Sequence, residues 1–383
     1  MALVLPFRLL VITPWYVVPD TFNTTRSANA FSVNHQDVSC LLCDPMKPLV
    51  SILIPAYNAE HCVAYTLQSA VAQTWPRTEI IVVDDGSKDG TVEVARRFAA
   101  PNVKIVSTEN QGQSGAVNTA YGLCQGDYIQ ELDADDILAP DKIEKQLTAL
   151  RADDSKRILL SGPWAYFRYR TSRARFVRSA LWQDLSPVEW LLRKMGGNLH
   201  MQNATWLMSR ELADAAGPWN TGLHYDQDGE YYCRVLLASE GTRFVPEARI
   251  FYRVSGTNRI SYIGSSDVKK NALFQSMKSH MANLRSLEDS ERVRKACLHY
   301  MQTWTQCFYP DRLDILAELQ TLAGEMGGRL EMPRLGWKYA WIKPIFGWKA
   351  AKRAQGVLAE TRDSFLSYWD KVMFEHETRE ISR

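Results

Sequence analysis

The stretch Asp-Tyr-Ile-Gln-Glu-Leu-Asp-Ala-Asp-Asp-Ile-Leu-Ala-Pro at positions 127–140 joins an apolar strand pattern to a cluster of carboxylates. Pro140 ends the segment before an amphipathic helix begins. Crowded carboxylates repel one another and need a positive partner, which Mg²⁺ or Mn²⁺ bridging to a diphosphate would supply. The alternative is a solvated acidic turn that caps the following helix. The carboxylates are those of Asp133, Asp135 and Asp136.

Upstream of this stretch, short apolar segments rich in β-branched residues alternate with amphipathic helical patterns. Residues 49–55, 79–83 and 103–106 have the pattern of buried strands. Asn58 is a candidate cap for the helix after the first of them. Such alternation predicts βαβ units, and therefore an α/β fold with a mostly parallel sheet and helices on both faces.

Each predicted strand is followed by polar or glycine-rich residues. They lie at 55–58, 84–87, 110–115 and 133–136. In parallel α/β sheets, ligands bind beyond the carboxyl ends of the strands. The four segments are therefore expected to converge on one edge of the sheet, which favours a ligand site over an isolated acidic turn.

Four motifs then carry a resemblance to a known family. They read Ile-Pro-Ala-Tyr-Asn (54–58), Val-Asp-Asp-Gly-Ser-x-Asp-Gly-Thr (83–91), Asn-x-Gly-x-x-x-Ala-x-Asn (110–118) and Leu-Asp-Ala-Asp-Asp (132–136). In this order and spacing they resemble the family 2 glycosyltransferases over about residues 49–261. The resemblance implies the GT-A fold, which is Rossmann-like, and inverting transfer from a nucleotide-diphosphate sugar to an acceptor hydroxyl.

The resemblance also assigns site residues. It implies that an Asp-x-Asp pattern holds Mg²⁺ or Mn²⁺ at the diphosphate, and that the first Asp of the motif contacts ribose or metal. Asp85 is expected at the nucleotide base, with Asp84 as the alternative. The full nucleotide-sugar set is Pro55, Tyr57, Asn58, Asp84, Asp85, Gly112, Gly115, Asn118 and Asp133, and the metal ligands are Asp135 and Asp136.

The catalytic base is expected in the segment Gln-Asp-Gly-Glu-Tyr-Tyr-Cys-Arg at 227–234. The family has a Glu-Asp pair with an arginine six residues after the Asp. Counting back from Arg234 therefore places Asp228 in the base position, while Gln227 replaces the usual Glu. Asp226 is a neighbouring alternative. A purely structural interpretation makes Asp228 the cap of the helix that follows.

A second departure from the family concerns the last core strand. The family shows Tyr-Arg-x-His there, whereas this chain has Tyr-Arg-Val-Ser at 252–255. Ser255 cannot replace imidazole as a strong metal ligand, so the third ligand stays open. The weaker candidates for the diphosphate or acceptor are Arg234, Arg253 and Arg259.

Two basic and aromatic segments lie outside these motifs. Residues 166–178 predict a hairpin that offers arginines to an anionic acceptor or lipid phosphates, or else a solvated strand face. Residues 334–353 carry six basic residues, no acid and several aromatic rings, which suits a membrane interface or packing against the catalytic domain. We expect an extension at 1–47, the GT-A domain at 48–262 and a helical region at 263–383.

The composition narrows the class of protein. The 383 residues are 46% hydrophobic and 23% charged, as expected for a chain with a real core. A net charge of +2 without a groove-reading motif argues against nucleic-acid binding. Seven scattered cysteines predict a reducing setting, and no apolar run is long enough to span a bilayer. We expect a cytoplasmic protein, at the inner face of the membrane if 334–353 contacts lipid.

The expected reaction partners follow from the resemblance. The donor is a nucleotide-diphosphate sugar, with UDP as the default carrier, and the acceptor is a saccharide or a lipid-linked molecule. Synthesis of polysaccharide, lipopolysaccharide or glycolipid is the expected setting. Two other classes stay open, a non-catalytic nucleotide-sugar-binding protein and a nucleotidyltransferase. The second is weaker, because the loop at 55–58 lacks glycines and a lysine.

Overall fold

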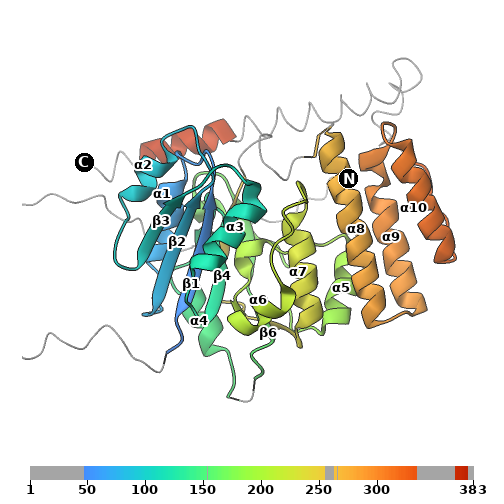
Figure 1. The fold of residues 1–383 in the computed structure, drawn as a ribbon, viewed down its shortest axis with the longest axis horizontal. Coiled ribbons are helices and arrows are strands. Elements are labelled where there is room, and N and C mark those ends of the chain that lie inside the picture. Colours follow the sequence, from blue (N-terminus) through green and yellow to red (C-terminus); the bar gives the residue numbers. More distant parts are fainter. Residues whose placement is uncertain (1–46, 153, 255–262, 265, 334–366, 378–383) are drawn as a thin grey trace, which may run out of the picture.

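The computed structural model describes residues 47–152, 154–254, 263–264, 266–333 and 367–377 (Figure 1). Its central sheet has the strand order β3-β2-β1-β4-β9. All neighbouring pairs are parallel except β4 with β9. This confirms the mostly parallel sheet expected from the sequence. The strands are β1 (Val50–Ala56), β2 (Thr78–Asp84), β3 (Val103–Ser107), β4 (Tyr128–Glu131) and β9 (Met208–Ser209).

Helices cover both faces of this sheet, because successive side chains of β1 point to opposite sides. Ile52 and Ile54 pack with α1 and α2 in one apolar cluster, whereas Leu53 packs with α3 in another. The helices of the α/β part are α1 (Val63–Val71), α2 (Thr91–Arg96), α3 (Gly112–Leu123), α4 (Lys142–Thr148), α5 (Pro187–Gly197), α6 (Arg210–Ala216) and α7 (Gln227–Ala238).

Two smaller sheets flank the central one. The first has the order β5-β11-β7-β8 and the second pairs β10 with β6. β7 and β8 are antiparallel, which confirms the hairpin expected at 166–178, and β11 is antiparallel to β5. The last pairing brings Arg253 beside the acidic stretch. The strands are β5 (Ile137–Leu138), β6 (Ile158–Ser161), β7 (Trp164–Phe167), β8 (Arg175–Phe176), β10 (Gly241–Phe244) and β11 (Ile250–Arg253).

Two local predictions were wrong. Asn58 does not cap α1, because the helix begins only after Cys62 and Asn58 has a left-handed backbone with φ 48°. The carboxamide of Asn58 instead accepts a hydrogen bond from the backbone N–H of Lys88. The glycine-rich segment at 110–115 is also not all loop, since α3 already begins at Gly112.

The C-terminal part is helical, as the sequence predicted, and Figure 1 shows its three long helices side by side at one end of the molecule. They share one apolar core with α5, α7 and the sheet, so the helical region packs as a direct continuation of the α/β part. Among the described residues, no helix is both long and apolar enough to cross a membrane. The helices are α8 (Asp267–Leu287), α9 (Glu291–Phe308) and α10 (Leu313–Glu325).

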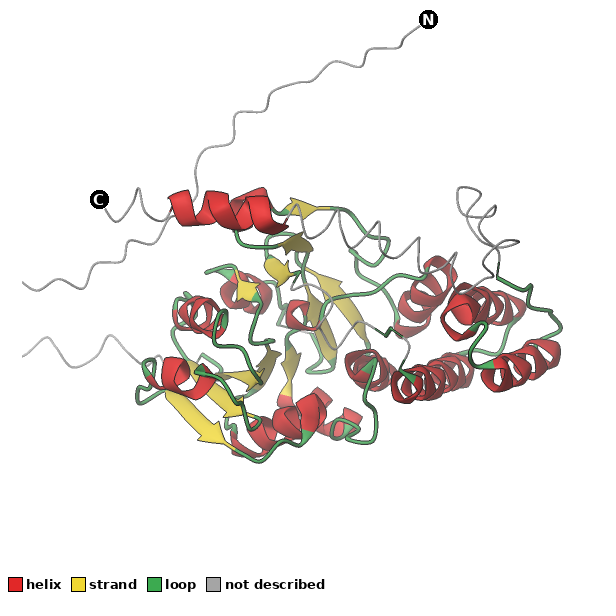
Figure 2. Ribbon diagram, turned by 90° about the horizontal axis from the view of Figure 1, so that it is seen from above, coloured by secondary structure: helices red, strands yellow, loops and turns green. Residues whose placement is uncertain are grey.

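One more helix, at residues 367–377, lies at the opposite end of the molecule from α10 in both views (Figure 2). The Oδ1 atom of Asp370 accepts a hydrogen bond from Nε of Arg170 at 2.8 Å, and Phe374 contacts the ring of Tyr65. The segment 334–353, for which we expected membrane contact, lies outside the described residues, as do Ser255 and Arg259.

Candidate active site

The loops after β1 and β2 are bound to each other at the carboxyl edge of the sheet. The backbone N–H of Asn58 donates to Ser87 Oγ at 2.9 Å, and the N–H of Ala59 donates to Thr91 Oγ1 at 2.7 Å. Tyr57 directly precedes these anchors and is 51% exposed. The backbone around Tyr57, from Pro55 at the end of β1 to Ala59, is therefore fixed by the protein, while the Tyr57 ring is exposed.

The two aspartates at the end of β2 have different surroundings. Asp85 Oδ1 accepts the backbone N–H of Gln111 at 2.7 Å, and the N–H of Gly112 bonds to the same carboxylate. Burial raises the pKa of Asp85, and these two hydrogen bonds oppose the rise. Asp84 is equally buried, but its Oδ1 has no hydrogen-bond partner among the described residues. An unsatisfied buried acceptor is costly, so the Oδ1 atom of Asp84 is a candidate acceptor for a donor that the protein does not supply.

The backbone conformation and packing at the start of α3 require two glycines, Gly112 and Gly115. Gly112 begins α3 with φ 78°, a left-handed conformation that favours glycine. A Cβ on Gly115 would lie 2.5 Å from Cβ of Gln111, so glycine is required there for packing within the helix start. Both residues thus shape the N-terminus of α3, where the Asp85 carboxylate accepts the N–H groups of Gln111 and Gly112.

The three carboxylates after β4 differ in how far their oxygens are already used. Asp133 Oδ1 accepts hydrogen bonds from Gln113 at 2.9 Å and Asn203 at 3.1 Å. Asp136 is fully buried, and its two oxygens accept from the Arg253 backbone N–H at 2.9 Å and from Gln202. Asp135 is only half-buried. Asp133 and Asp135 are thus both half-buried, whereas Asp136 is buried and accepts protein donors.

This cluster has too little positive charge of its own. Burial raises the pKa of Asp133 to about 7, and the charges of Asp135 and Asp228 add to the rise. Burial likewise raises the pKa of Asp136 well above its ordinary value, with Asp135 and Asp133 contributing. Arg253 lies nearest, but its Nε donates to the backbone carbonyl of Asp135 at 2.8 Å. A cation bound here would favour the ionised carboxylates.

The residues present fit a divalent cation of the oxygen-preferring kind. Asp133 and Asp135 offer oxygen atoms only, as Mg²⁺ and Mn²⁺ prefer. Within the described ranges, no three His, Cys, Asp or Glu side chains form a complete metal site. Mg²⁺ commonly takes one or two carboxylates and completes its shell with substrate phosphates and water, which matches this donor set.

At the start of α7 the structure separates the two candidate bases. Asp226, with φ 56°, is the residue that precedes the helix, so Asp228 is not its cap. Asp226 Oδ2 accepts a hydrogen bond from Ser276 Oγ at 2.5 Å. Asp228 lies in the first turn and is half-buried. Burial raises the pKa of Asp228, and the charge of Asp226 raises it further.

The charge of Asp228 also affects the carboxylates at the end of β4. This charge contributes to the raised pKa values of Asp133 and of Glu131, so the carboxylates of α7 and β4 lie within electrostatic reach of one another. Carboxylates about one hundred positions apart in the chain therefore influence one another at this edge of the sheet.

Sequence reasoning missed Glu131, which is buried at the end of β4. Its two carboxylate oxygens accept hydrogen bonds from Trp219 Nε1 and Tyr232 Oη, both at 2.9 Å, and burial raises its pKa to about 8. Asn118 fixes the same tryptophan, since its carboxamide exchanges two 2.9 Å hydrogen bonds with the Trp219 backbone. The sequence signal that could have identified Glu131 was the presence of a charged residue in a predicted buried strand.

Of the predicted arginines, the two that the structure describes are bound to protein groups. Arg234 forms an ion pair with Glu230 and donates to the carbonyls of Ala216 and Pro218, which ties α7 to the loop after α6. Arg253 donates to the carbonyl of Arg168 at 2.7 Å as well as to Asp135, and it lies over the ring of Phe167. Arg253 therefore borders the acidic stretch.

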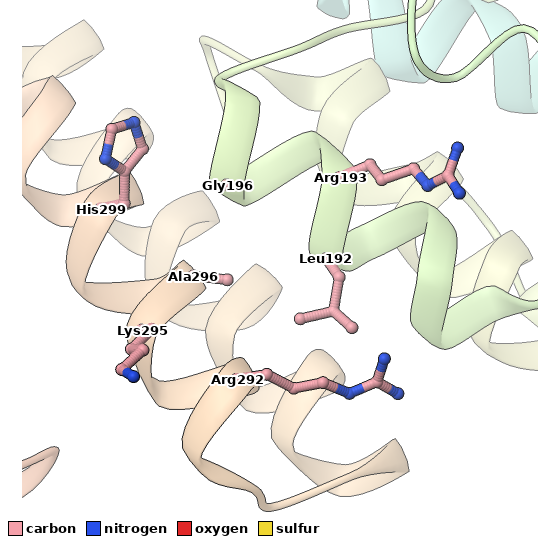
Figure 3. Close-up of a pocket in the computed structure, with 7 residues that line it drawn as sticks. All are labelled: Leu192, Arg193, Gly196, Arg292, Lys295, Ala296 and His299. Atoms are coloured by element: carbon pink, nitrogen blue, oxygen red, sulfur yellow. The ribbon is translucent and has the colours of Figure 1, made fainter.

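Away from these residues, a hollow lies between α5 and α9, where Leu192 and Ala296 project between the helices (Figure 3). Its cations already have partners. Arg292 pairs with Glu189 and Glu288, and Lys295 pairs with Glu291 at 2.7 Å. Of the residues that the structure describes, only those of α5 and α9 line this hollow, and none of the predicted site residues is among them, so the edge of the sheet is the better candidate for the active site.

The comparisons with known proteins agree with this geometry. The sequence profile of glycosyl transferase family 2 matches residues 51–214. The chain is 44% identical over 108 residues to a chondroitin synthase of Escherichia coli, which covers 28% of this chain and 16% of that protein. It is 30% identical over 192 residues to an uncharacterized glycosyltransferase of Rickettsia typhi, which covers 50% of this chain and 60% of that protein. The chain thus spans less than two thirds of these relatives.

The fold matches solved structures over more of the chain. A crystal structure of Staphylococcus aureus TarS 1-349 in complex with UDP-GlcNAc superposes with a TM-score of 0.58 at 15% identity. The match covers 72% of this chain and 81% of that one. At this identity the likeness concerns the fold, and it extends beyond residues 51–214.

Proposed function

The chain belongs to glycosyl transferase family 2, and we propose that it moves a sugar from a nucleotide-diphosphate sugar to an acceptor hydroxyl with inversion at the anomeric carbon. The observation that carries the proposal is that α7, the helix of Asp228, is joined to the end of β4 by the Tyr232–Glu131 hydrogen bond, and that the charges of Asp135 and Asp228 both act on Asp133. UDP is the expected carrier, which agrees with the UDP-GlcNAc complex of TarS. The acceptor is a saccharide or a lipid-linked molecule.

The nucleotide base is assigned to the loops after β1 and β2. The unpartnered oxygen of Asp84 can accept an N–H from the base, and the exposed Tyr57 ring beside Pro55 supplies stacking area. Asp85 has its carboxylate on the N-terminus of α3 and therefore holds that helix in place. This reverses the preference that the resemblance suggested, with Asp84 as the contact and Asp85 as its support.

The diphosphate is assigned to Asp133, Asp135 and a divalent cation. When bound, Mg²⁺ or Mn²⁺ would stabilise the charge of the departing nucleoside diphosphate as a Lewis acid. Asp136, expected as a ligand, is better placed as a support, because both of its oxygens already accept hydrogen bonds. Gln113 and Asn203 orient the Asp133 carboxylate from two sides.

Asp228 is assigned the role of general base. Its carboxylate takes the proton from the acceptor hydroxyl while that oxygen bonds to the anomeric carbon and the bond to the diphosphate breaks. A raised pKa makes a carboxylate a stronger base near neutral pH, and such catalysis typically contributes about 10²–10⁴-fold. Asp226 is less suitable, because Ser276 already donates to its carboxylate.

We also assign peripheral membrane contact to the C-terminal region, in addition to residues 334–353. The helix at 367–377 exposes Tyr368 and Trp369, with exposed fractions of 66% and 51%. Aromatic side chains of this kind suit the interface of a bilayer. Such contact would place the enzyme at the inner face of the membrane, near lipid-linked acceptors of envelope polysaccharide synthesis.

A thermal-shift screen tests the proposal. Nucleoside diphosphates and nucleotide sugars are added with Mg²⁺ or Mn²⁺, and a bound ligand raises the apparent stability by mass action, by about 2.7 kcal/mol at a hundredfold excess over its Kd. We expect UDP and a UDP-sugar to raise the melting temperature only with the metal present. Failure of every nucleotide to do so would refute the donor assignment.

A further inference from the structure

The start of α7, which carries Asp228, is in contact with a buried chain of polar groups from the C-terminal helices. Ser276 and His280 lie one turn apart on α8, and Tyr300 lies on α9. All three side chains are buried. They belong to the part of the chain beyond the family 2 match at residues 51–214.

The hydrogen bonds run in sequence from the helix pair to the loop before α7. Tyr300 Oη lies 3.1 Å from His280 Nδ1, and His280 Nε2 lies 3.4 Å from Ser276 Oγ. Ser276 Oγ donates to Asp226 Oδ2 at 2.5 Å. His280 also bonds to the backbone of Gly229 in the first turn of α7. This series of hydrogen bonds thus ends on Asp226, two positions before Asp228, and on Gly229, the residue after it.

Asp226 needs such an anchor because its own conformation is unfavourable. A residue with a side chain is disfavoured in the left-handed region, where Asp226 has φ 56°. Its carboxylate lies against Gly229, and a Cβ at that glycine would overlap it. Its carbonyl accepts the N–H of Glu230 at 3.0 Å, which closes the first turn. The position of Asp226 therefore fixes the direction in which the first turn leaves the loop.

We propose that Ser276, supported by His280 and Tyr300, is a positioning residue that holds Asp226 and thereby aims the Asp228 carboxylate at the acceptor. The C-terminal helices are then part of the catalytic apparatus, although they supply no group that touches the substrate. The catalytic consequence rests on the proposed function, whereas the positioning itself rests on the contacts described above.

The test compares Ser276→Ala with Ser279→Ala, a control on the same helix whose serine is only half-buried. Hydrogen–deuterium exchange is followed in peptides that cover residues 224–231. We expect faster exchange there in Ser276→Ala, with α8 itself still protected, and no change in Ser279→Ala. Equal exchange in the two variants would overturn the positioning role.

Kinetics then measure the catalytic consequence. Hydrolysis of UDP-GlcNAc with Mn²⁺, in which water replaces the acceptor, is expected to show a kcat lower by about tenfold to a hundredfold in Ser276→Ala. The KM should stay within about twofold, because Asp84, Asp133 and Asp135 are untouched. A KM change with unaltered kcat would contradict the inference, since it would place Ser276 in donor binding.

The two proposals fail in different ways. A wild-type protein that hydrolyses no UDP-sugar refutes the proposed function, while the exchange experiment still decides whether Ser276 positions the loop. If Ser276→Ala does not fold, Tyr300→Phe replaces it, because this change deletes only the hydroxyl bonded to His280. The same local increase in exchange is then expected, and its absence would overturn the inference.

Discussion

The replacement Asp228→Asn tests the base assignment with little change in shape. The half-buried carboxylate becomes a neutral amide of the same size, so the site loses its proton acceptor and one negative charge. Loss of a general base is expected to lower kcat by about 10²–10⁴-fold, which corresponds to about 2.7–5.5 kcal/mol of barrier. The measurement is the rate of UDP-sugar hydrolysis or transfer at saturating donor.

Donor binding should respond in the opposite direction. The charge of Asp228 adds to the burial that raises the pKa of Asp133. Removing the charge of Asp228 lowers that pKa, so calorimetry should find UDP–Mn²⁺ binding unchanged or at most about twofold tighter. Asp214→Asn, at an exposed position on α6, is the matched control. A near wild-type rate in Asp228→Asn, or loss of UDP binding along with the rate, would refute the assignment.

Three further results are expected. In Asp135→Asn, Mn²⁺ should no longer strengthen UDP binding in calorimetry, whereas Asp136→Asn should mainly lower the melting temperature; the reverse pattern would exchange their roles. For Glu131, burial raises the pKa from its ordinary 4.5 to about 8. Between these pH values the folded protein binds more protons than the unfolded chain. The free energy of unfolding therefore falls with rising pH, by at most about 1.4 kcal/mol per pH unit. Glu131→Gln should therefore flatten the decline of melting temperature from pH 5 to 8, and parallel curves would contradict this. Replacing both Tyr368 and Trp369 with serine should reduce flotation with anionic liposomes, and undiminished flotation would argue against contact through this helix.

The central sheet was predictable from sequence because its strands are locally coded. β1 and β2 are short apolar runs rich in β-branched residues, and they remain strands in almost any compact context. The rule that parallel strands align their carboxyl ends then placed the aspartates of β2 and β4 at one edge. The long helices α8 and α9 were also evident, since each repeats apolar residues at helical spacing over four or more turns.

Features that depend on tertiary contacts were not predictable. Asn58 is of a residue type that is common at helix caps, but its carboxamide accepts a hydrogen bond from the backbone N–H of Lys88 in the neighbouring loop. β9 has only two residues, too few for any periodicity. Asp226, which has a left-handed backbone, accepts a hydrogen bond from Ser276, fifty positions later in the chain. Sequence indicated which carboxylates are candidates for the site, but which of them already accept hydrogen bonds from the protein required the structure.

The most direct test of the account is the position of a metal and a nucleotide in a crystal grown with UDP and Mn²⁺. The account predicts an anomalous manganese signal bound by the Asp135 carboxylate and the diphosphate, with Asp133 beside it and the uracil within hydrogen-bond distance of Asp84. Manganese and UDP bound elsewhere, for example in the hollow between α5 and α9, would contradict it.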